Sequence, residues 1–461
     1  MHKFSNRTNF FTLAFALIIP VIAAGLCGCK RQDSPVTVPR PDPHIITIWW
    51  AQIPQADVLQ RLANSFGQET GISVQVQKIP VTQFERDVLA EIRKDVTEFD
   101  IVVGDPHWLG QGAAKSTGNE VSNTPYLELT DWMADNLDLS NINAQVLKNM
   151  CEYPPGSGRY YAAPCLIDIA CVAYRRDWFA SEREREAFRL RYGRELAPPR
   201  TWTQFHEIAQ FFYRPDQDRY GVVMPTARSG DSLVFSFQQM MWAGGGGWRD
   251  DDGKIQGVLN GKAGVDAANF LRKMVALSPE SADGYDYDQA IDTFVEGSAA
   301  MMVNYASNCA TLVDLMPGAV DFFAMPRQGT NRGVTMGGYS LSVSNKTTDK
   351  KREMALKFIR WFQEHPNQIK WSLNVGCLTA DRRILKSETF RTMTGFNRVY
   401  FTSVDDARIF SRSPHSVQLG RAATASLGRM LDGDEPAQQV LDELATRYEK
   451  ISQSHNRHAA P

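Results

Sequence analysis

The first part of the chain's body alternates between short apolar runs and stretches whose apolar side chains recur at helical spacing. Residues 45–50 form a short apolar run rich in β-formers, which is typical of a buried strand. The next stretch keeps its apolar side chains on one helical face and ends at Gly71. The predicted order is strand, helix, strand, helix and strand, over residues 45–50, 56–70, 72–79, 84–96 and 99–103. This alternation predicts a parallel sheet built from right-handed crossovers.

Two loops follow the first and third of these strands. In open parallel sheets, ligands bind beyond the carboxyl ends of the strands. Residues 50–54 and 104–108 therefore mark a candidate binding edge, and the second of these loops reads Gly-Asp-Pro-His-Trp.

Further elements are expected beyond this region. A helix follows a Pro-Pro pair, with Thr201 or Thr203 as its N-cap. Another helix covers residues 235–242 and ends at a run of glycines. Residues 250–253 read Asp-Asp-Asp-Gly, and we interpret them as a turn because no downstream ligand spacing supports a calcium loop.

The start of the chain has a different pattern, in which a basic beginning leads into an apolar run that closes on small residues. This layout predicts a secretory signal peptide over residues 1–28. The short run and Pro20 in its middle argue against the alternative of a transmembrane anchor. The sequence Leu-Cys-Gly-Cys that ends at Cys29 resembles the bacterial lipoprotein signal, so we expect Cys29 to be acylated. Cys27 fits less well because a leucine would occupy a position that requires a small residue.

Residues 29–44 are then the lipidated cysteine and a Pro-rich, polar tether that spaces the body from a membrane. We expect the protein in the cell envelope, lipid-anchored on the periplasmic or extracytoplasmic side. The choice between inner and outer membrane stays open, because Lys30 follows the cysteine in place of the Asp that commonly marks inner-membrane retention.

Composition bounds the size and the partners of the body. The chain has 461 residues, 43% of them apolar, which is enough for two large lobes. The formal net charge of −2 argues against a partner with a phosphate backbone, so no nucleic acid is expected. The basic run over residues 183–194 is interleaved with glutamates and is interpreted as a solvated helix face.

Seven cysteines are present, and five remain after the expected signal is processed. An odd number in an oxidising compartment leaves at least one thiol unpaired. Cys151 and Cys165 bracket a Pro/Gly turn and are able to bridge, but single buried thiols explain the sequence nearly as well. The remaining three are Cys171, Cys309 and Cys377. No His/Cys cluster occurs at zinc spacing, so no metal is expected.

A series of short motifs follows one another along residues 45–450. They are the lipoprotein signal, Ile46-Thr47-Ile48-Trp49-Trp50, Phe66-x-x-Glu69-Thr70-Gly71-Ile72, Phe99-Asp100-Ile101-Val102, Tyr161-Ala162-Ala163-Pro164 through Asp168, Tyr174-Arg175-Arg176-Asp177-Trp178-Phe179, Pro199-x-Thr201-Trp202, Phe294-x-x-Gly297-x-Ala299-Ala300-Met301, Met325-Pro326, Gly337-Gly338-Tyr339-Ser340-Leu341 and Ala355-x-x-Phe358-Ile359-x-x-Phe362. Each motif is weak alone, but their order is specific. Together they resemble the family 1 extracellular solute-binding proteins of ABC importers, the maltose-binding-protein-like group that mostly carries sugars.

The resemblance implies an α/β, two-lobed periplasmic-binding-protein fold, with a central mostly parallel sheet in each lobe and hinge strands between them. By analogy, lobe 1 comprises residues 45–167 plus 340–378, lobe 2 comprises 168–339 plus 379–450, and residues 451–461 form a flexible tail. Hinges are expected near residues 168–169, 338–339 and 379.

A sugar requires aromatic side chains that stack on its faces and short polar side chains that pair with its hydroxyls. With the resemblance, the expected ligand-binding residues are Trp50, Gln52, Asp105, His107, Trp108, Asp168, Trp242, Trp248, Asn304, Tyr305, Gly338 and Tyr339. Alternatives stay open for several of them: Trp50 or its neighbour packs inside, Trp108 belongs to the core, or Asp168 caps a hinge. Many relatives carry a Trp shortly after the position of Tyr305, which this chain lacks.

The resemblance implies a monomeric binding protein that captures a carbohydrate, a mono- or oligosaccharide, and delivers it to an ABC permease and its ATPase. No cofactor and no catalysis are expected. The alternatives are a non-sugar ligand such as a polyamine, iron or glycerol phosphate, a lipoprotein glycosidase using Asp105 and Asp168, and a sensing role rather than uptake.

Overall fold

The computed structural model of the protein describes residues 45–114, 124–282, 284–433 and 435–453. The expected signal peptide, Cys29 and the Pro-rich tether lie outside the described residues. The chain divides into residues 1–42 and 43–461, and every element below belongs to the second of these units. The last helix continues to Gln453, so it extends into the tail expected from residue 451.

Three parallel strands form the first portion of the sheet. β1 (Ile45–Ala51) lies between β2 (Ser73–Ile79) and β3 (Ile101–Gly104) and is parallel to both. Helix α1 (Pro54–Thr70) connects β1 to β2, and α2 (Val81–Glu91) lies between β2 and β3 along the chain. These elements confirm the predicted alternation of strands and helices in a parallel arrangement.

Helix α2 ends at Glu91 rather than at residue 96, because the side chain of this last residue closes a turn. The Glu91 carboxylate accepts a hydrogen bond from the backbone N–H of Glu98 at 2.7 Å and pairs with Lys94 at 2.6 Å. A buried carboxylate with these partners competes with continuation of the helix and directs the chain into β3.

Two long strands carry the sheet beyond the first portion. β9 (Val334–Val343) pairs antiparallel with β3 through its C-terminal end and with the N-terminal half of β4 (Ala163–Arg175). The C-terminal half of β4 lies between β5 (Met301–Tyr305) and β6 (Val320–Ala324). The strand order is β2-β1-β3-β9-β4-β5, with β6 also on β4, so both portions belong to one continuous sheet.

The mostly parallel sheet expected in each lobe is present in the first portion, whereas the second portion is mixed. Both β5 and β6 pair antiparallel with β4. The reason is that β4 carries the chain away from the place where it pairs with β9, whereas β5 and β6 run back toward that place. Parallel pairing occurs here as isolated bridges, such as that between Val223 and Met302.

We call residues 166–169 of β4 and 336–339 of β9 the crossing segment, because the chain passes there between the two portions. Gly338 has a φ of +98°, and a Cβ at this position would lie 2.1 Å from the carbonyl oxygen of Leu166. Only glycine permits this close approach of β9 to β4. The crossing segment is therefore held by backbone geometry that a side chain would disrupt.

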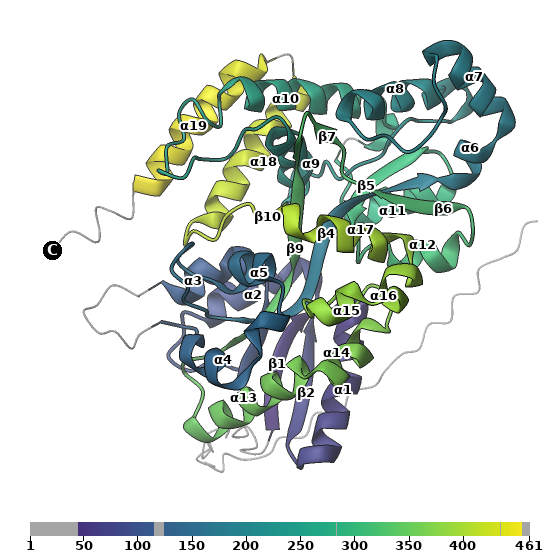
Figure 1. Cartoon of the computed structure of the whole chain (residues 1–461). Helices are drawn as coiled ribbons and strands as arrows, with labels where there is room; N and C mark the ends of the chain where they lie inside the picture. The colour runs from purple at the N-terminus through teal and green to yellow at the C-terminus, as the bar shows by residue number, and fades with distance from the viewer. Residues whose placement is uncertain (1–44, 115–123, 283, 434, 454–461) are drawn as a thin grey trace, which may run out of the picture. The chain divides into compact units, whose positions relative to one another are not determined.

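Helices α1, α13 (Asp349–Gln363) and α14 (His365–Ser372) pack together beside β1 and β2 (Figure 1). Their apolar faces meet through aromatic rings, with the centroids of Phe66 and Phe358 5.3 Å apart. Trp50 of β1 stacks on Trp371 of α14 at 6.4 Å. The first portion thus has an aromatic core that fixes the position of the C-terminal end of β1.

Beside the second portion, α9 (Ser232–Ala243) packs with α10 (Lys262–Val275) and α18 (Ser416–Asp432), and α18 packs with α19 (Ala437–Gln453) (Figure 1). Every residue of α9 is buried. The sequence pattern predicted this helix over residues 235–242 only, and it begins earlier because Ser232 also packs inside.

Three local predictions are confirmed. Thr201 caps α8 (Trp202–Phe212) by accepting a hydrogen bond from the backbone N–H of Gln204 at 3.2 Å. The Asp-Asp-Asp-Gly sequence forms a turn, in which the Asp250 carboxylate accepts from the N–H of Lys254 at 2.8 Å. Most of the basic run lies on α7 (Glu182–Tyr192), whose residues are mainly exposed.

The remaining described elements are short or peripheral. They are α3 (Leu109–Ala113), α4 (Thr130–Asn136), α5 (Ala144–Val146), α6 (Arg176–Ala180), α11 (Tyr287–Glu296), α12 (Ala310–Leu315), α15 (Arg382–Lys386), α16 (Glu388–Met393), α17 (Gly395–Ser403), β7 (Arg327–Gln328), β8 (Asn331–Arg332), β10 (Ala407–Arg408), the 3₁₀ turns η1 (Pro106–Trp108), η2 (Leu139–Asn141), η4 (Pro215–Gln217), η5 (Glu280–Ala282) and η6 (Val404–Asp406), and the π-helical turn η3 (Leu147–Cys151). Within the described parts of the chain, no helix combines the length and the apolar character that crossing a membrane requires.

The five cysteines of the described body are all buried free thiols. Cys151 and Cys165 therefore do not form the bridge that their spacing permits. Burial raises the pKa of the Cys151 thiol to about 12, because the apolar surroundings disfavour the thiolate. These cysteines are small packing residues of the core in this structure.

Candidate functional site

The carboxyl ends of β3 and β5 arrive at the crossing segment from opposite sides. Gly104, the last residue of β3, pairs with Ser340, which follows Tyr339 of the crossing segment. Tyr305, the last residue of β5, pairs with Ala170, which follows the crossing segment in β4. The two strand ends that geometry singles out for ligand binding therefore face the same short stretch of backbone.

The first side of this site is the turn that leaves β3. Asp105 caps η1 by accepting a hydrogen bond from the backbone N–H of His107 at 2.8 Å, and its carboxylate also pairs with His107 Nδ1 at 2.9 Å. Burial alone would lower the pKa of His107, but Asp105, with Asp231 and Glu85, raises it above the ordinary value. His107 Nε2 is buried and has no hydrogen-bond partner among the described residues.

The second side is built from the beginnings of two helices and the end of β5. Asp231 precedes α9, and its carboxylate accepts a hydrogen bond from the Tyr287 hydroxyl of α11 at 2.8 Å. The rings of Tyr287 and Tyr305 lie 5.4 Å apart, and Phe235 contacts both rings at 5.4 and 4.6 Å. Burial raises the pKa of Asp231, whereas the nearby His107 opposes this rise.

Tyr339 of the crossing segment lies between the two sides. Its ring contacts Trp50 at 5.8 Å and Phe84 of α2 at 6.5 Å, so the first portion supports it from behind. A Cβ at Gly337 would lie 2.6 Å from the ring of Tyr305, so this glycine lets Tyr305 pack directly against β9. Burial raises the pKa of the Tyr339 hydroxyl, and the carboxylates of Asp105, Asp231 and Asp168 add to this rise.

We call six of these residues the crossing cluster: Asp105, His107, Asp231, Tyr287, Tyr305 and Tyr339. All six residues are partly exposed, although His107 Nε2 is buried. Carboxylates, tyrosine hydroxyls and an imidazole pair with hydroxyl groups, and the tyrosine rings offer flat apolar faces. The arrangement fits a small polar molecule with both C–H faces and hydrogen-bonding groups.

Additional contacts join the two sides around the cluster. The Ser416 hydroxyl of α18 donates a hydrogen bond to the carbonyl oxygen of His107. Arg421 of α18 pairs with Glu85 of α2 at 2.9 Å. Ser307 donates its backbone N–H to Asp168 at 3.0 Å and its hydroxyl to the same carboxylate, which fastens the turn after Tyr305 to the crossing segment.

Several predicted residues lie beside the cluster rather than in it. Trp50 is completely buried beneath Tyr339, and its indole N–H has no partner among the described residues. Trp108 is buried against Phe84 at 5.4 Å. Asp168 is buried and bonded to Ser307, with its pKa raised to about 7 by burial. Gln52 is exposed just after β1, where its backbone N–H donates to Ile79.

The other predicted residues have contacts within the protein. Trp242 is buried in α9. Trp248 stacks on Tyr448 at 5.7 Å and donates its indole N–H to Gln238 at 3.1 Å, so these partners hold its ring. Asn304 donates to the carbonyl of Tyr287 at 3.0 Å and accepts the N–H of Tyr305 at 2.8 Å. It thereby positions two tyrosines of the cluster.

Sequence reasoning missed Asp231, Phe235 and Tyr287. A start of α9 at Phe235 left Asp231 in a loop, whereas an earlier start would have placed its carboxylate at a helix N-terminus. Tyr287 follows Asp286, which forms a capping box with Gln289 at the beginning of α11. This capping box is a signal in the sequence for a helix start, but it does not reveal which loops meet.

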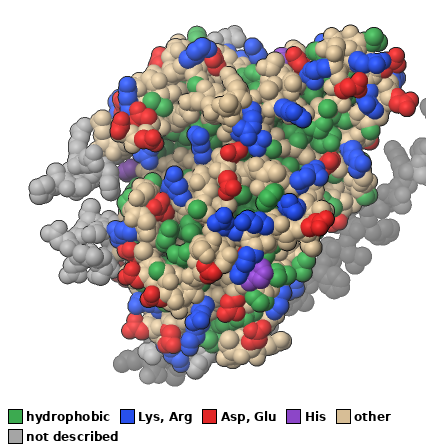
Figure 2. All heavy atoms as spheres, viewed as in Figure 1, with side chains coloured by type: hydrophobic (Ala, Val, Ile, Leu, Met, Phe, Trp, Pro, Cys, Tyr) green, Lys and Arg blue, Asp and Glu red, His purple; other side chains and the backbone are tan. Residues whose placement is uncertain are grey.

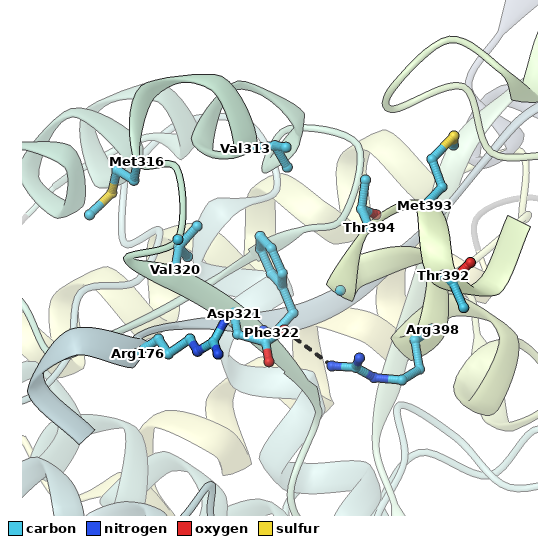
Figure 3. Close-up of a pocket in the computed structure, with 12 residues that line it drawn as sticks. Arg176, Val313, Met316, Val320, Asp321, Phe322, Thr392, Met393, Thr394 and Arg398 are labelled. Atoms are coloured by element: carbon cyan, nitrogen blue, oxygen red, sulfur yellow. Dashed lines mark hydrogen bonds and ion pairs between the residues drawn. The ribbon is translucent and has the colours of Figure 1, made fainter. Parts of the chain in front are cut away.

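Two surface pockets lie elsewhere, and neither is lined by a residue of the crossing cluster. A pocket of about 330 Å³ lies between β6 and α17, where Arg398 pairs with Asp321 at 3.1 Å and Arg176 lies nearby (Figure 3). Another of about 600 Å³ lies beside α8 and α10 and includes Lys262 and Arg327. Positive and negative side chains are interspersed over the face viewed in Figure 2.

No group of His, Cys, Asp and Glu side chains within the described residues is arranged to hold a metal ion.

Comparison with known proteins assigns the chain to a family. Residues 50–369 match the family described as bacterial extracellular solute-binding protein. The maltotriose-binding protein of Pyrococcus abyssi is 22% identical over 324 residues. That match covers 68% of this chain and 63% of the relative, so the chain spans less than two thirds of the length of this relative.

Solved structures share the fold over most of both chains. A solute-binding protein of an ABC transporter from Agrobacterium radiobacter K84, in complex with ribitol, has a TM-score of 0.73 at 22% identity and covers 88% of this chain and 98% of its own. Maltose-bound MalE3 of T. maritima has a TM-score of 0.74 at 20% identity and covers 88% and 99%. The chain belongs to the family of bacterial extracellular solute-binding proteins.

Proposed function

We propose that this protein captures a carbohydrate, a mono- or oligosaccharide, at the crossing cluster and delivers it to the permease and ATPase of an ABC importer. The observation that carries the proposal is the convergence of Asp105 and His107 with Asp231, Tyr287 and Tyr305 around Tyr339. Ring faces and hydroxyl-binding groups from both lobes match the two kinds of surface that a sugar presents. The ligands named for the relatives, maltotriose, maltose and ribitol, support this chemistry.

The lobes are proposed to comprise residues 45–167 plus 340–378 and residues 168–339 plus 379–450. Closure would then bend the chain near residues 168–169 and 338–339, within the crossing segment, and near residue 379. A ligand that contacts both lobes stabilises the closed arrangement, because only that arrangement allows all contacts at once. The contacts of Ser416 with His107 and of Arg421 with Glu85 would break on opening.

Acylation of Cys29 is part of the same proposal. A lipid on this residue, followed by a Pro-rich tether, would keep the binding protein beside its permease. Mass spectrometry of the protein purified from membranes tests this, with Cys29→Ala as the variant. Loss of the lipid adduct and release of the protein from the membrane fraction are expected. An unchanged membrane fraction for the variant would reject the anchor.

Calorimetric titration of the purified protein with maltotriose, maltose, ribitol, glucose and mannitol tests the ligand class. At least one of them is expected to bind and to be recovered unchanged. Tyr305→Ala is expected to weaken binding at least about tenfold, because it removes a ring face from the cluster. Tyr213→Ala is the matched control, since Tyr213 contacts Tyr220 outside the cluster.

Binding of one of the other candidate ligands would contradict the proposal. Binding of a polyamine, ferric iron or glycerol phosphate, with no response to any sugar, would reject the carbohydrate assignment. Release of a hydrolysis product from an oligosaccharide would reject the assignment of a binding protein without catalysis.

A further inference from the structure

We propose that the carbohydrate bound at the crossing cluster carries a protonated amine, as an amino sugar does, and that Asp231 receives this amine. The inference rests on the proposed function and narrows its substrate class. It comes from the way in which charge is distributed between the two sides of the cluster.

The two carboxylates of the cluster have different partners. Asp105 is paired with His107 at 2.9 Å, so it has a cationic partner whenever the imidazole is protonated. Asp231 accepts the Tyr287 hydroxyl at 2.8 Å and forms no ion pair with a Lys or Arg of the described residues. This carboxylate is partly removed from water, and His107, the cationic group that acts on it, is shared with Asp105.

The charged groups that act on the neighbouring tyrosines are also acidic. Asp231, Asp105 and Asp168 each raise the pKa of the Tyr305 hydroxyl, and the same three raise that of Tyr339, in addition to the effect of burial. Glu85 also acts on His107, but its charge is paired with Arg421 at 2.9 Å. Two carboxylates of the cluster, Asp105 and Asp231, therefore share one imidazole, and a cation on the ligand would supply a second positive charge.

The aromatic rings around Asp231 also favour a positively charged group on the ligand. Phe235, Tyr287 and Tyr305 form a group with centroids 4.6 to 5.4 Å apart, beside the carboxylate. Aromatic faces attract an ammonium group, and a carboxylate forms charge-assisted hydrogen bonds with it that are about twice as strong as neutral ones. A hydroxyl at the same place would donate a single hydrogen bond to the carboxylate and bring no charge.

The remaining groups distinguish an amino sugar from a polyamine. His107 Nε2 is buried without a partner among the described residues. The cluster also contains the hydroxyls of Tyr305 and Tyr339, each able to donate and accept a hydrogen bond. These groups require several hydrogen-bonding partners, which the hydroxyls of a sugar supply and a polymethylene chain does not. The cluster thus combines one site for a cation with several sites for hydroxyls.

Matched ligands test the inference. Glucose, galactose and mannose are each titrated at pH 7 beside their 2-amino and 2-acetamido forms, together with cellobiose and its doubly amino counterpart. At least one amino form is expected to bind at least tenfold more tightly than each neutral form with which it is matched. Neutral forms that bind as well as every amino form would overturn the inference while the carbohydrate function stands. Absence of binding by every amino form would also overturn the inference.

Asp231→Asn provides the second measurement, because asparagine retains an acceptor for Tyr287 but no charge. The variant is expected to lose at least tenfold in affinity for the amino form and less than threefold for a neutral form. Asp349→Asn, at a carboxylate that is 97% exposed, is the charge control and is expected to change neither affinity. Equal losses for amino and neutral forms in Asp231→Asn would assign the residue a structural role and overturn the inference. Binding of putrescine alone would reject the carbohydrate function instead.

Discussion

The two sides of the crossing cluster contribute different chemistry to one site. The first side is a short turn after a parallel strand, in which Asp105 and His107 satisfy each other. The second side gathers Asp231, Tyr287 and Tyr305 from two helix starts and a strand end. Its carboxylate accepts the Tyr287 hydroxyl and interacts with His107 of the first side. The difference indicates that the first side is preorganised by local contacts, whereas the second depends on packing between distant segments.

The largest expected effect comes from the segment that joins the sides. Gly338→Ala places a Cβ 2.1 Å from the carbonyl oxygen of Leu166 in a backbone conformation with positive φ. We expect the free energy of unfolding to fall by about 2–5 kcal/mol in denaturant titrations. Gly156→Ala is the control, because Gly156 also has a positive φ but no neighbour within 4 Å of its Cβ position. Equal losses for both variants would show that conformational strain alone acts at Gly338.

Next in size is the pH dependence of stability that arises from Asp168, the residue that fastens the second side to the crossing segment. Burial raises the pKa of Asp168 to about 7 from a model-peptide value of 3.8. Between these values the folded protein binds more protons than the unfolded chain, so the free energy of unfolding falls as pH rises from about 4 to about 7. Relative to Asp168→Asn, the fall is expected to be about 2–4 kcal/mol in denaturant titrations across this range.

A second variant sharpens this measurement. The Ser307 hydroxyl donates to the Asp168 carboxylate and lowers its pKa, so Ser307→Ala is expected to move the decline to higher pH. Parallel stability curves for the wild type and Asp168→Asn would contradict the assignment.

A smaller effect is expected on the first side. Burial would lower the pKa of His107, but the Asp105 carboxylate raises it, so Asp105→Asn is expected to lower it in an NMR titration of the imidazole. Stability from the pair is fully present below the unfolded pKa of about 6.5 and is lost as pH rises through the folded pKa. Glu85→Gln should lower the pKa less, since Glu85 contributes less to the shift. An unchanged His107 titration in Asp105→Asn would mean that the turn does not hold the pair.

The smallest effect is expected where the two sides meet at the surface. Arg421 and Glu85 pair at 2.9 Å, but their side chains are 73% and 42% exposed. Arg421→Ala should change the free energy of unfolding by less than about 0.5 kcal/mol, because water and salt screen exposed pairs. A loss above about 1 kcal/mol in thermal or denaturant unfolding would show that the sides depend on this surface contact.

The first side was predictable from the sequence, and the second was predictable only in part. Asp105 and His107 follow a strand of a parallel sheet, and a general rule places such residues at a binding edge. Tyr305 and Tyr339 were identified through the motifs of the family. Asp231 and Tyr287 were not, because their meeting depends on how α9 and α11 pack.

Aromatic composition was the weaker guide. Trp248 follows a run of glycines that lets backbone approach a ligand, which made it a candidate platform. In the folded chain its ring meets Phe410 and Tyr448, two residues from the far end of the sequence. The hydrophobic periodicity and the composition of a sequence indicate that a large aromatic ring serves packing or binding. Only the tertiary contacts of the ring decide between these two roles.

The pairing of β3 with β9 also bears on the order in which the chain folds. β3 ends at Gly104, and its partner residues in β9 begin at Ser340, so the first portion of the sheet lacks this neighbouring strand until most of the chain has been synthesised. Pairing over such a separation delays folding, since a long loop must close before the contact forms. The pairing of β3 with β9 is therefore expected to form late, after the segments between them have been synthesised.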